Sequence, residues 1–147
     1  ASIYERQGNF AEAIRSYETL LQQQPNLIVA KNNLASLLSD YGKDAASLDR
    51  ARSIAAELRD SPIPQFRDTY AWISVKSGRN LEEAVAILAG IVKENDAVDI
   101  YNYHLGEAYR KKGDTQKAAL YLKKARDLAR PGSNVASLAA DSLKQLN

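Results

Sequence analysis

The sequence predicts an all-α fold, an α-solenoid of antiparallel helix pairs, and three observations support this prediction. Alanine is abundant and β-branched residues are sparse, a composition that favours helices over strands. Four glycines recur at nearly constant intervals: Gly8, Gly42, Gly78 and Gly113 are separated by 34, 36 and 35 residues. Apolar residues between them recur mostly in steps of three and four, the period of one helix face. Each interval therefore has room for two helices and two turns.

The turns follow from the same glycines. Each glycine suits the left-handed residue that ends a helix, and a polar residue just after it can begin the next one. Asn9-Phe-Ala-Glu12 and Asn80-Leu-Glu-Glu83 have the form of capping boxes, as does Asp96-Ala-Val-Asp99 more weakly. The turn after Gly42 is about four residues longer than the turn after Gly8. Three residues could cap the helix that follows it: Asp44, Ser47 or Asp49.

The repeats divide one domain of 147 residues as follows. A partial repeat spans 1–26, three full repeats span 27–62, 63–96 and 97–130, and a capping helix spans 133–146. Pro131-Gly132 precedes that last helix, in which Val135, Ala139 and Leu143 share one face. We expect this face to be buried on the preceding repeat, as terminal helices of repeat proteins require. Because the chain begins partway through a repeat, we expect it to be a module of a longer protein.

The pattern resembles the tetratricopeptide repeat, whose signature is W-x2-L-G-x2-Y, then A-x3-F, then P. The fourth repeat matches through Leu105-Gly106-x2-Tyr109, followed by Ala118 and Leu122. The resemblance covers about residues 1–130. It implies that small residues let neighbouring helices approach closely: Ala35, Ala71 and Gly106. The chain departs from the family at the early tryptophan, where it has Lys31, Arg67 and Asn102, and at the closing proline of the third repeat, where it has Asp96.

The resemblance also implies a binding surface, because the first helix of each pair in this family lines a concave groove that takes peptides or proteins. Helical phase selects the residues that would face this groove: Asn32, Asn33, Ser36, Asp40, Asp68, Thr69, Trp72, Lys76, Tyr103, His104, Glu107, Arg110 and Lys111. Amide side chains can hydrogen-bond an extended peptide, and Trp72 or Tyr103 can anchor a side chain. Two other interpretations stay open: these residues merely solvate the inner surface, or Trp72 is a core residue between the second and third repeats.

No motif for catalysis or for a cofactor is present. The chain has no cysteine and a single histidine, which excludes thiolate chemistry, zinc–sulfur sites and poly-histidine metal centres. His104 and Glu107 lie three residues apart on one helix face, but the spacing offers no further metal ligand, and His104 is expected to be a groove-lining or partly exposed residue. We therefore predict a non-catalytic protein without metal or cofactor. The longest apolar run has nine residues, too few to cross a bilayer.

The net charge of +2 conceals an uneven distribution. Residues 1–100 carry −3, while residues 101–147 carry +5. Besides Arg110 and Lys111, a basic patch is predicted around the fourth repeat: Lys112, Lys117, Lys123, Lys124, Arg126 and Arg130. These cations either form a solvated face near helix carboxyl ends or dock an acidic partner such as a polysaccharide. Nucleic acid is not expected, because no aromatic platform accompanies the charges.

The sequence thus favours a scaffold that binds a partner protein or peptide. The alternatives are an acidic polymer on the fourth repeat, or a spacer that associates with itself through Ile3, Tyr4 and Phe10. A finer resemblance connects the Asn32-Asn33-Leu-Ala and Asp68-Thr-Tyr-Ala-Trp72 segments with repeat proteins of bacterial exopolysaccharide synthesis and export. It implies a bacterial protein of the periplasm or envelope in preference to the cytoplasm.

Overall fold

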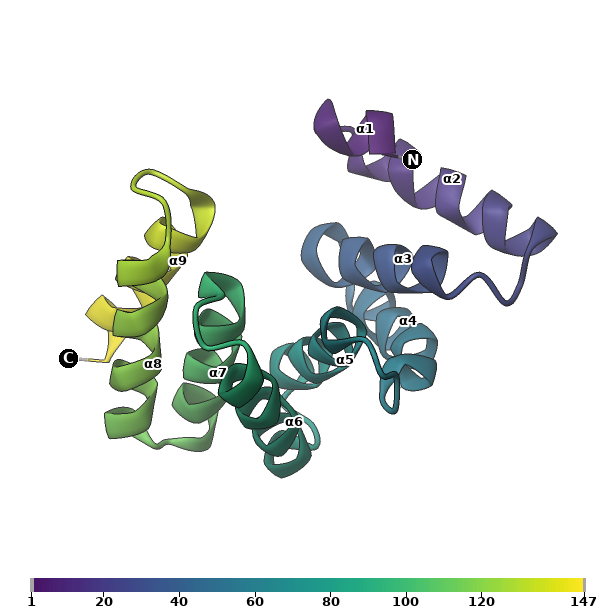
Figure 1. The fold of residues 1–147 in the computed structure, drawn as a ribbon. Helices are drawn as coiled ribbons and strands as arrows, with labels where there is room; N and C mark the ends of the chain where they lie inside the picture. Colours follow the sequence, from purple (N-terminus) through teal and green to yellow (C-terminus); the bar gives the residue numbers. More distant parts are fainter. Residues whose placement is uncertain (1, 147) are drawn as a thin grey trace. The chain divides into compact units, whose positions relative to one another are not determined.

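The computed structural model describes residues 2–146, and within that range the regular secondary structure is helical throughout (Figure 1). The predicted all-α fold class is thus confirmed for the described part of the chain. The helices are α1 (Ser2–Arg6), α2 (Phe10–Gln23), α3 (Ile28–Tyr41), α4 (Ala45–Ala55), the 3₁₀ helix η1 (Ala56–Leu58), α5 (Pro64–Ser77), α6 (Leu81–Glu94), α7 (Asp99–Lys112), α8 (Thr115–Leu128) and α9 (Asn134–Gln145).

Three of the four predicted glycines adopt the left-handed conformation that ends a helix. Gly8, Gly78 and Gly113 have φ of 73°, 68° and 87°. Gly42 differs, because its φ of −66° is open to any residue. A Cβ atom at Gly42 would nevertheless lie 2.2 Å from the Cβ of Ser47, so glycine is needed for close approach of the chain.

Side-chain caps begin four of the helices. Asp44, Asp114 and Ser133 each accept a hydrogen bond from the backbone N–H three residues on, as does Asn9 at 3.3 Å. Of the three predicted candidates, Asp44 is the residue that caps α4. Such caps satisfy backbone donors that the first turn of a helix leaves unpaired.

The other two predicted capping boxes are wrong. Asn80 precedes α6 but is itself left-handed, with φ of 54°, and its side chain makes no capping bond. Helix α7 begins at Asp99 after Val98, so Asp96 lies outside the helix and caps nothing. A capping residue typically has an extended backbone, whereas Asn80 is left-handed and so does not have the conformation of a cap.

The chain forms two compact units, one ending at Ile73 and one beginning at Ser74, with the division inside α5. In unit 1, α2 packs on α3 and α3 packs on α4. Its core consists of fully buried side chains such as Leu34 of α3 and Leu58 of η1, together with small residues such as Ala55 of α4. Burying one leucine side chain contributes about 1.5–3 kcal/mol.

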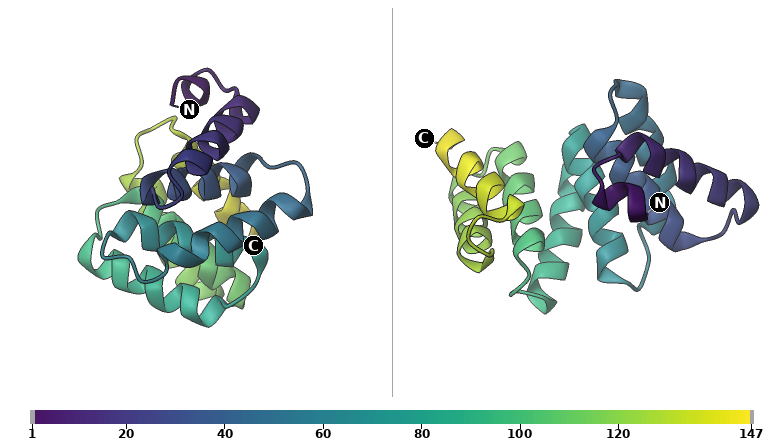
Figure 2. Two further views of the ribbon diagram at one scale, coloured as in Figure 1. Left: turned by 90° about the vertical axis from the view of Figure 1, so that its right-hand side faces the viewer. Right: turned by 90° about the horizontal axis from the view of Figure 1, so that it is seen from above.

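In unit 2, α7 packs against both α6 and α8, and α9 packs on α8 and also reaches α7. The right-hand view of Figure 2 shows α9, in yellow, alongside the green α8. Residues 102–108 of α7 are all buried, so this helix is covered around its whole circumference. The predicted close approach at Gly106 is confirmed, because an added Cβ there would meet Leu122 of α8 at 2.8 Å.

Candidate partner-binding surfaces

The polar residues predicted on α3 form a hydrogen-bonded chain that reaches α2. The Asn33 side-chain amide donates to the Tyr17 hydroxyl at 2.9 Å, and the Asn32 amide donates to the Asn33 carbonyl oxygen at 3.1 Å. Asn32 is 3% exposed, and its own side-chain oxygen is buried without a hydrogen-bond partner. An unpaired buried acceptor costs about 1–3 kcal/mol. These amides are therefore held in place by their neighbours, with one acceptor left unsatisfied.

The predicted residues of unit 1 differ in how accessible they are. Asn33 and Ser36 are half-buried and Asp40 is exposed, so α3 presents all three to solvent. On α5, Asp68 and Thr69 are buried. Trp72 is half-buried, between the two predicted extremes of a free anchor and a core residue.

The predicted residues of α7 lie mostly in the interior of unit 2. Tyr103, His104 and Glu107 are 7%, 7% and 4% exposed. Arg110 donates two hydrogen bonds to Oε2 of Glu107, from Nε at 3.1 Å and from Nη2 at 2.7 Å. The hydrogen bond to this carboxylate raises the pKa of Arg110. Arg110 and Glu107 thus form a largely buried ion pair whose cation is partly open to solvent. Of the residues of α7 predicted to face the groove, Lys111 is the exposed one. Lys76, at the other end of unit 2, is half-buried.

Helix α9 accounts for much of this burial. Tyr103 of α7 hydrogen-bonds with Ser142 of α9, and Ser142 is itself buried. Desolvation, followed by the negative charge of Glu107, raises the pKa of Tyr103. The sequence pattern predicted Tyr103 in an open groove. It also predicted a capping helix, and that helix had to cover one face of the preceding repeat. Helix α9 covers the face of α7 that carries Tyr103.

The predicted basic patch is exposed at every position, but part of its charge is used within unit 2. Lys112 pairs with Glu82 of α6 at 2.7 Å. Lys117 lies 3.9 Å from Asp114 and 5.3 Å from the centre of the Tyr109 ring. Lys124 lies 5.2 Å from the ring centre of Tyr121. Exposed contacts of this kind contribute little to stability, but they reduce the charge available to a partner.

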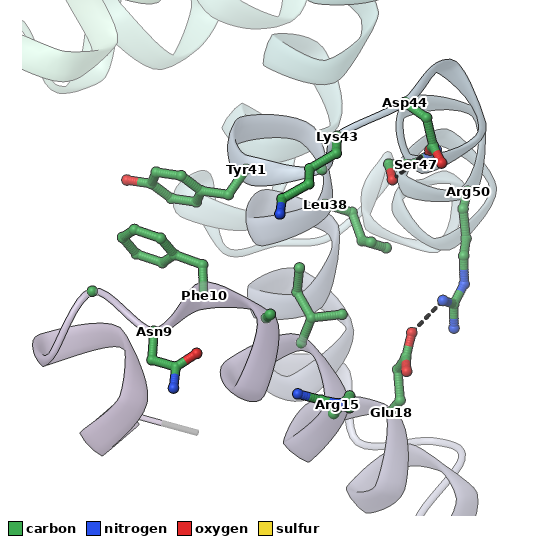
Figure 3. A pocket seen from close by; sticks show the side chains of 14 residues that line it. Asn9, Phe10, Arg15, Glu18, Leu38, Tyr41, Lys43, Asp44, Ser47 and Arg50 are labelled. Carbon is green, nitrogen blue, oxygen red and sulfur yellow. Dashed lines mark hydrogen bonds and ion pairs between the residues drawn. The ribbon is translucent and has the colours of Figure 1, made fainter.

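Unit 1 also contains a cleft that sequence reasoning missed. It has a volume of about 730 Å³ and lies between the start of α2, the end of α3 and the start of α4 (Figure 3). Phe10 and Tyr41 stack along it with ring centres 3.6 Å apart, and Tyr41 is 47% exposed. An ion pair between Glu18 and Arg50 crosses between two of its walls. The longer turn after Gly42 was the signal that could have found this cleft, because that turn forms one wall.

Among residues 2–146, no group of three or more histidine or acidic side chains is placed to hold a metal ion. A search of the same residues for a helix long and apolar enough to cross a membrane also found none. The candidate sites are therefore surfaces and clefts lined by amides, aromatic rings and paired charges.

Helix pairs of similar length, joined at glycines and packed through small residues, define a helical repeat protein. The comparisons identify which kind: residues 75–133 and residues 1–26 match two models of the tetratricopeptide repeat. The chain belongs to the tetratricopeptide-repeat family. No curated protein matches its sequence.

Solved structures match the fold. One is described as MamA 41-end from Desulfovibrio magneticus RS-1, with a TM-score of 0.68 and 18% identity, covering 99% of this chain and 84% of that one. Another is described as a crystal structure of MamA, with a TM-score of 0.64 and 18% identity, covering 97% of this chain and 90% of that one. At this identity the likeness concerns the fold alone, and the predicted α-solenoid class agrees with it.

Proposed function

We propose that the chain is a non-catalytic scaffold that holds a segment of a partner protein against the polar side of α3. The repeat fold is one that serves protein–protein interaction in general, and this supports the coarser part of the proposal. The finer part rests on one observation: the Asn32–Asn33–Tyr17 chain presents fixed amide groups beside the accessible Ser36 and Asp40. Groups that are already ordered lose less entropy when a peptide binds to them.

The single tryptophan supplies the test. Trp72 is the only tryptophan of the chain, and it is half-buried in unit 1, so its fluorescence reports on this unit. Peptides selected from a phage-displayed library on the immobilised chain would be synthesised and titrated against it. Asn33→Ala should weaken their binding about tenfold, which corresponds to about 1.4 kcal/mol.

Asn134→Ala is the matched control, because it removes the same amide from an exposed position on α9. It should leave the affinity unchanged. Selected peptides that bind Asn33→Ala as tightly as the parent chain would contradict the proposed surface on α3. Failure to select any peptide would contradict the scaffold function itself.

The cleft of Figure 3 favours a second contact for the same partner. Its exposed ring of Tyr41 and its apolar wall at Leu38 and Ile14 suit an apolar side chain of the bound protein. Aromatic side chains at interfaces carry a large share of binding energy. If this cleft takes part, Tyr41→Ala should weaken the selected peptides as well, and unchanged binding would confine the partner to α3.

The setting proposed for the scaffold is a bacterial envelope assembly, in particular one for exopolysaccharide synthesis or export. Its support is the sequence resemblance of the Asn32-Asn33-Leu-Ala and Asp68-Thr-Tyr-Ala-Trp72 segments. Fractionation of cells that express the full-length parent protein would test it. Recovery from the cytoplasm alone would contradict an envelope location.

Self-association is the remaining alternative for unit 1. Ile3 is 68% exposed and Tyr4 is 38% exposed on the short helix α1, so two copies of the chain could meet there. Light scattering across a wide range of protein concentrations distinguishes the two functions. A monomer at high concentration would leave partner binding as the function, and a dimer lost on Ile3→Ser would favour association between copies.

A further inference from the structure

A second cleft lies in unit 2, between α8 and α9, and has a volume of about 430 Å³. Helix α8 lines it with Ala119, Lys123 and Arg126, and helix α9 with Leu143, Lys144 and Leu146. The cleft belongs to unit 2, whereas the amide chain of α3 belongs to unit 1. The cleft lies within residues 101–147, whose net charge is +5.

The lining of this cleft is positive and contains no carboxylate. Among residues 2–146, Lys123 and Lys144 form no ion pair, while Arg126 contacts only the neighbouring Asp127, at 3.2 Å. Asp141 of α9 is not among the residues that line the cleft. Three cations within one cleft, two of them unpaired, favour an anionic occupant.

The floor between these cations is apolar. Ala119 and Ala140 are small and half-buried, so a third element can approach the two helices closely. Leu143 and Leu146 are half-buried at the same place and offer apolar surface to an occupant. A trough between two helices, with an apolar floor and a charged rim, has the form that accepts an amphipathic helix. A polysaccharide would use the rim and leave the floor uncovered.

We propose that the α8–α9 cleft binds an acidic amphipathic helix of a partner protein, with its apolar face on Ala119, Leu143 and Leu146 and its carboxylates on Lys123, Arg126 and Lys144. This rests on the proposed scaffold function, but it assigns a second binding surface and the chemical class of its partner. The contacts of the basic residues support it, because Lys112, Lys117 and Lys124 are engaged with Glu82, Tyr109 and Tyr121. Within the described part of the chain, Lys123 and Lys144 at the cleft form no ion pair, and Arg126 pairs with its neighbour Asp127.

The test uses the full chain and three probes. The first is a synthetic helical peptide with leucines on one face and glutamates on both flanks, the second is a scrambled peptide of the same composition, and the third is the acidic polysaccharide alginate. Affinities are measured by fluorescence anisotropy with labelled peptide. The amphipathic peptide should bind at least about tenfold more tightly than the scrambled one. Its binding should weaken as salt shortens the Debye length to about 3 Å at 1 M.

Two variants locate the binding. The double substitution Lys123→Glu and Lys144→Glu should abolish it, and Ala119→Gln should weaken it without changing the charge. Lys93→Glu, exposed on α6 of the same unit, is the matched charge control and should retain nearly the parent affinity. All these positions are exposed or half-buried, and far-UV circular dichroism establishes that each variant is folded.

Several outcomes would overturn the proposal. Equal affinity for the amphipathic and scrambled peptides, or full competition by alginate, would show that charge alone binds and that an acidic polymer is the occupant. Parent-like binding by both the double variant and Ala119→Gln would remove the cleft from consideration. Asn33→Ala should leave this peptide unaffected, so failure at α3 and failure at the α8–α9 cleft are distinguishable.

Discussion

Gly106 lies at a close contact between α7 and α8, and Gly106→Ala is expected to destabilise the fold although alanine is the better helix former. A Cβ at Gly106 would lie 2.8 Å from Cγ of Leu122, 3.0 Å from its Cδ2 and 3.0 Å from its backbone N. Leu122 is fully buried, so its side chain has no open space to move into. Helix α7 would have to move away from α8.

Two opposing terms decide the magnitude. Replacing glycine by alanine within a helix contributes about 1 kcal/mol of stability. Overpacking a filled contact costs about 1–3 kcal/mol. The net loss at Gly106 is thus up to about 2 kcal/mol. Gly90 supplies the matched control, because it lies within α6 of the same unit and an added Cβ meets nothing within 4 Å. Gly90→Ala should therefore gain about 1 kcal/mol.

Thermal unfolding followed by far-UV circular dichroism measures both effects. Each 1 kcal/mol shifts the midpoint by about 2–4 °C for a chain of this size, so the two variants should move in opposite directions. A double variant tests the cause of this loss. Leu122→Ala removes two of the three close atoms, so Gly106→Ala should lower the stability of the Leu122→Ala variant less than it lowers that of the parent chain. If Gly106→Ala raises the midpoint as Gly90→Ala does, the close approach of α7 and α8 is refuted.

Three further predictions concern paired groups. Arg110→Met leaves the buried carboxylate of Glu107 without its cation. The free energy of unfolding measured in urea should fall by about 1–3 kcal/mol, which is less than for a fully buried pair because Arg110 is partly exposed. Burial and the charge of Glu107 raise the pKa of Tyr103. The neutral Tyr103 side chain therefore contributes to stability below pH 10, and this contribution is lost as the pH rises through the raised pKa. Tyr103→Phe should remove this alkaline loss when the free energy of unfolding is measured against pH. Asp44→Ala should lower the thermal midpoint, whereas Asp44→Asn should retain it at neutral pH because asparagine also caps helices. Hydrogen bonds from Ser47 lower the pKa of Asp44, so its contribution is present above the ordinary carboxyl pKa and is lost as the pH falls through the lowered value.

The helix pairs were predictable because their signals are local. A glycine that must be left-handed, such as Gly113, and a cap that bonds three residues on, such as Ser133, depend on a few adjacent residues. The same locality explains the errors. The sequence around Asn80 has the pattern of a helix cap. Whether an asparagine caps a helix or turns the chain depends on its backbone conformation, and that conformation depends on the turn it forms with its neighbours.

The candidate sites were less predictable, since they depend on which helix covers which face. Helical phase groups Tyr103 and Glu107 with Arg110; in the structure Arg110 hydrogen-bonds Glu107, and the charges of both act on Tyr103. Phase alone does not say that α9 lies over Tyr103, because that requires the packing of an element some 40 residues away in sequence. The cleft at Phe10 and Tyr41 was missed for the same reason, as its two rings come from different helices.

Two of the three departures from the family's tryptophan position, Arg67 and Asn102, have a common physical consequence in the turns between repeats. Arg67 donates from Nη1 to the carbonyl of Ser61 at 2.8 Å, and Asn102 donates from Nδ2 to the carbonyl of Asp96 at 3.0 Å. Both bonds span six residues and tie the first helix of a pair to the turn that precedes it. Arg67 forms this bond in a turn that contains Pro62, and Asn102 forms it where Asp96 replaces the closing proline, so the bond restrains the turn with or without a proline. Lys31, the third of these residues, instead pairs with the carboxylate of Glu57, 26 residues downstream.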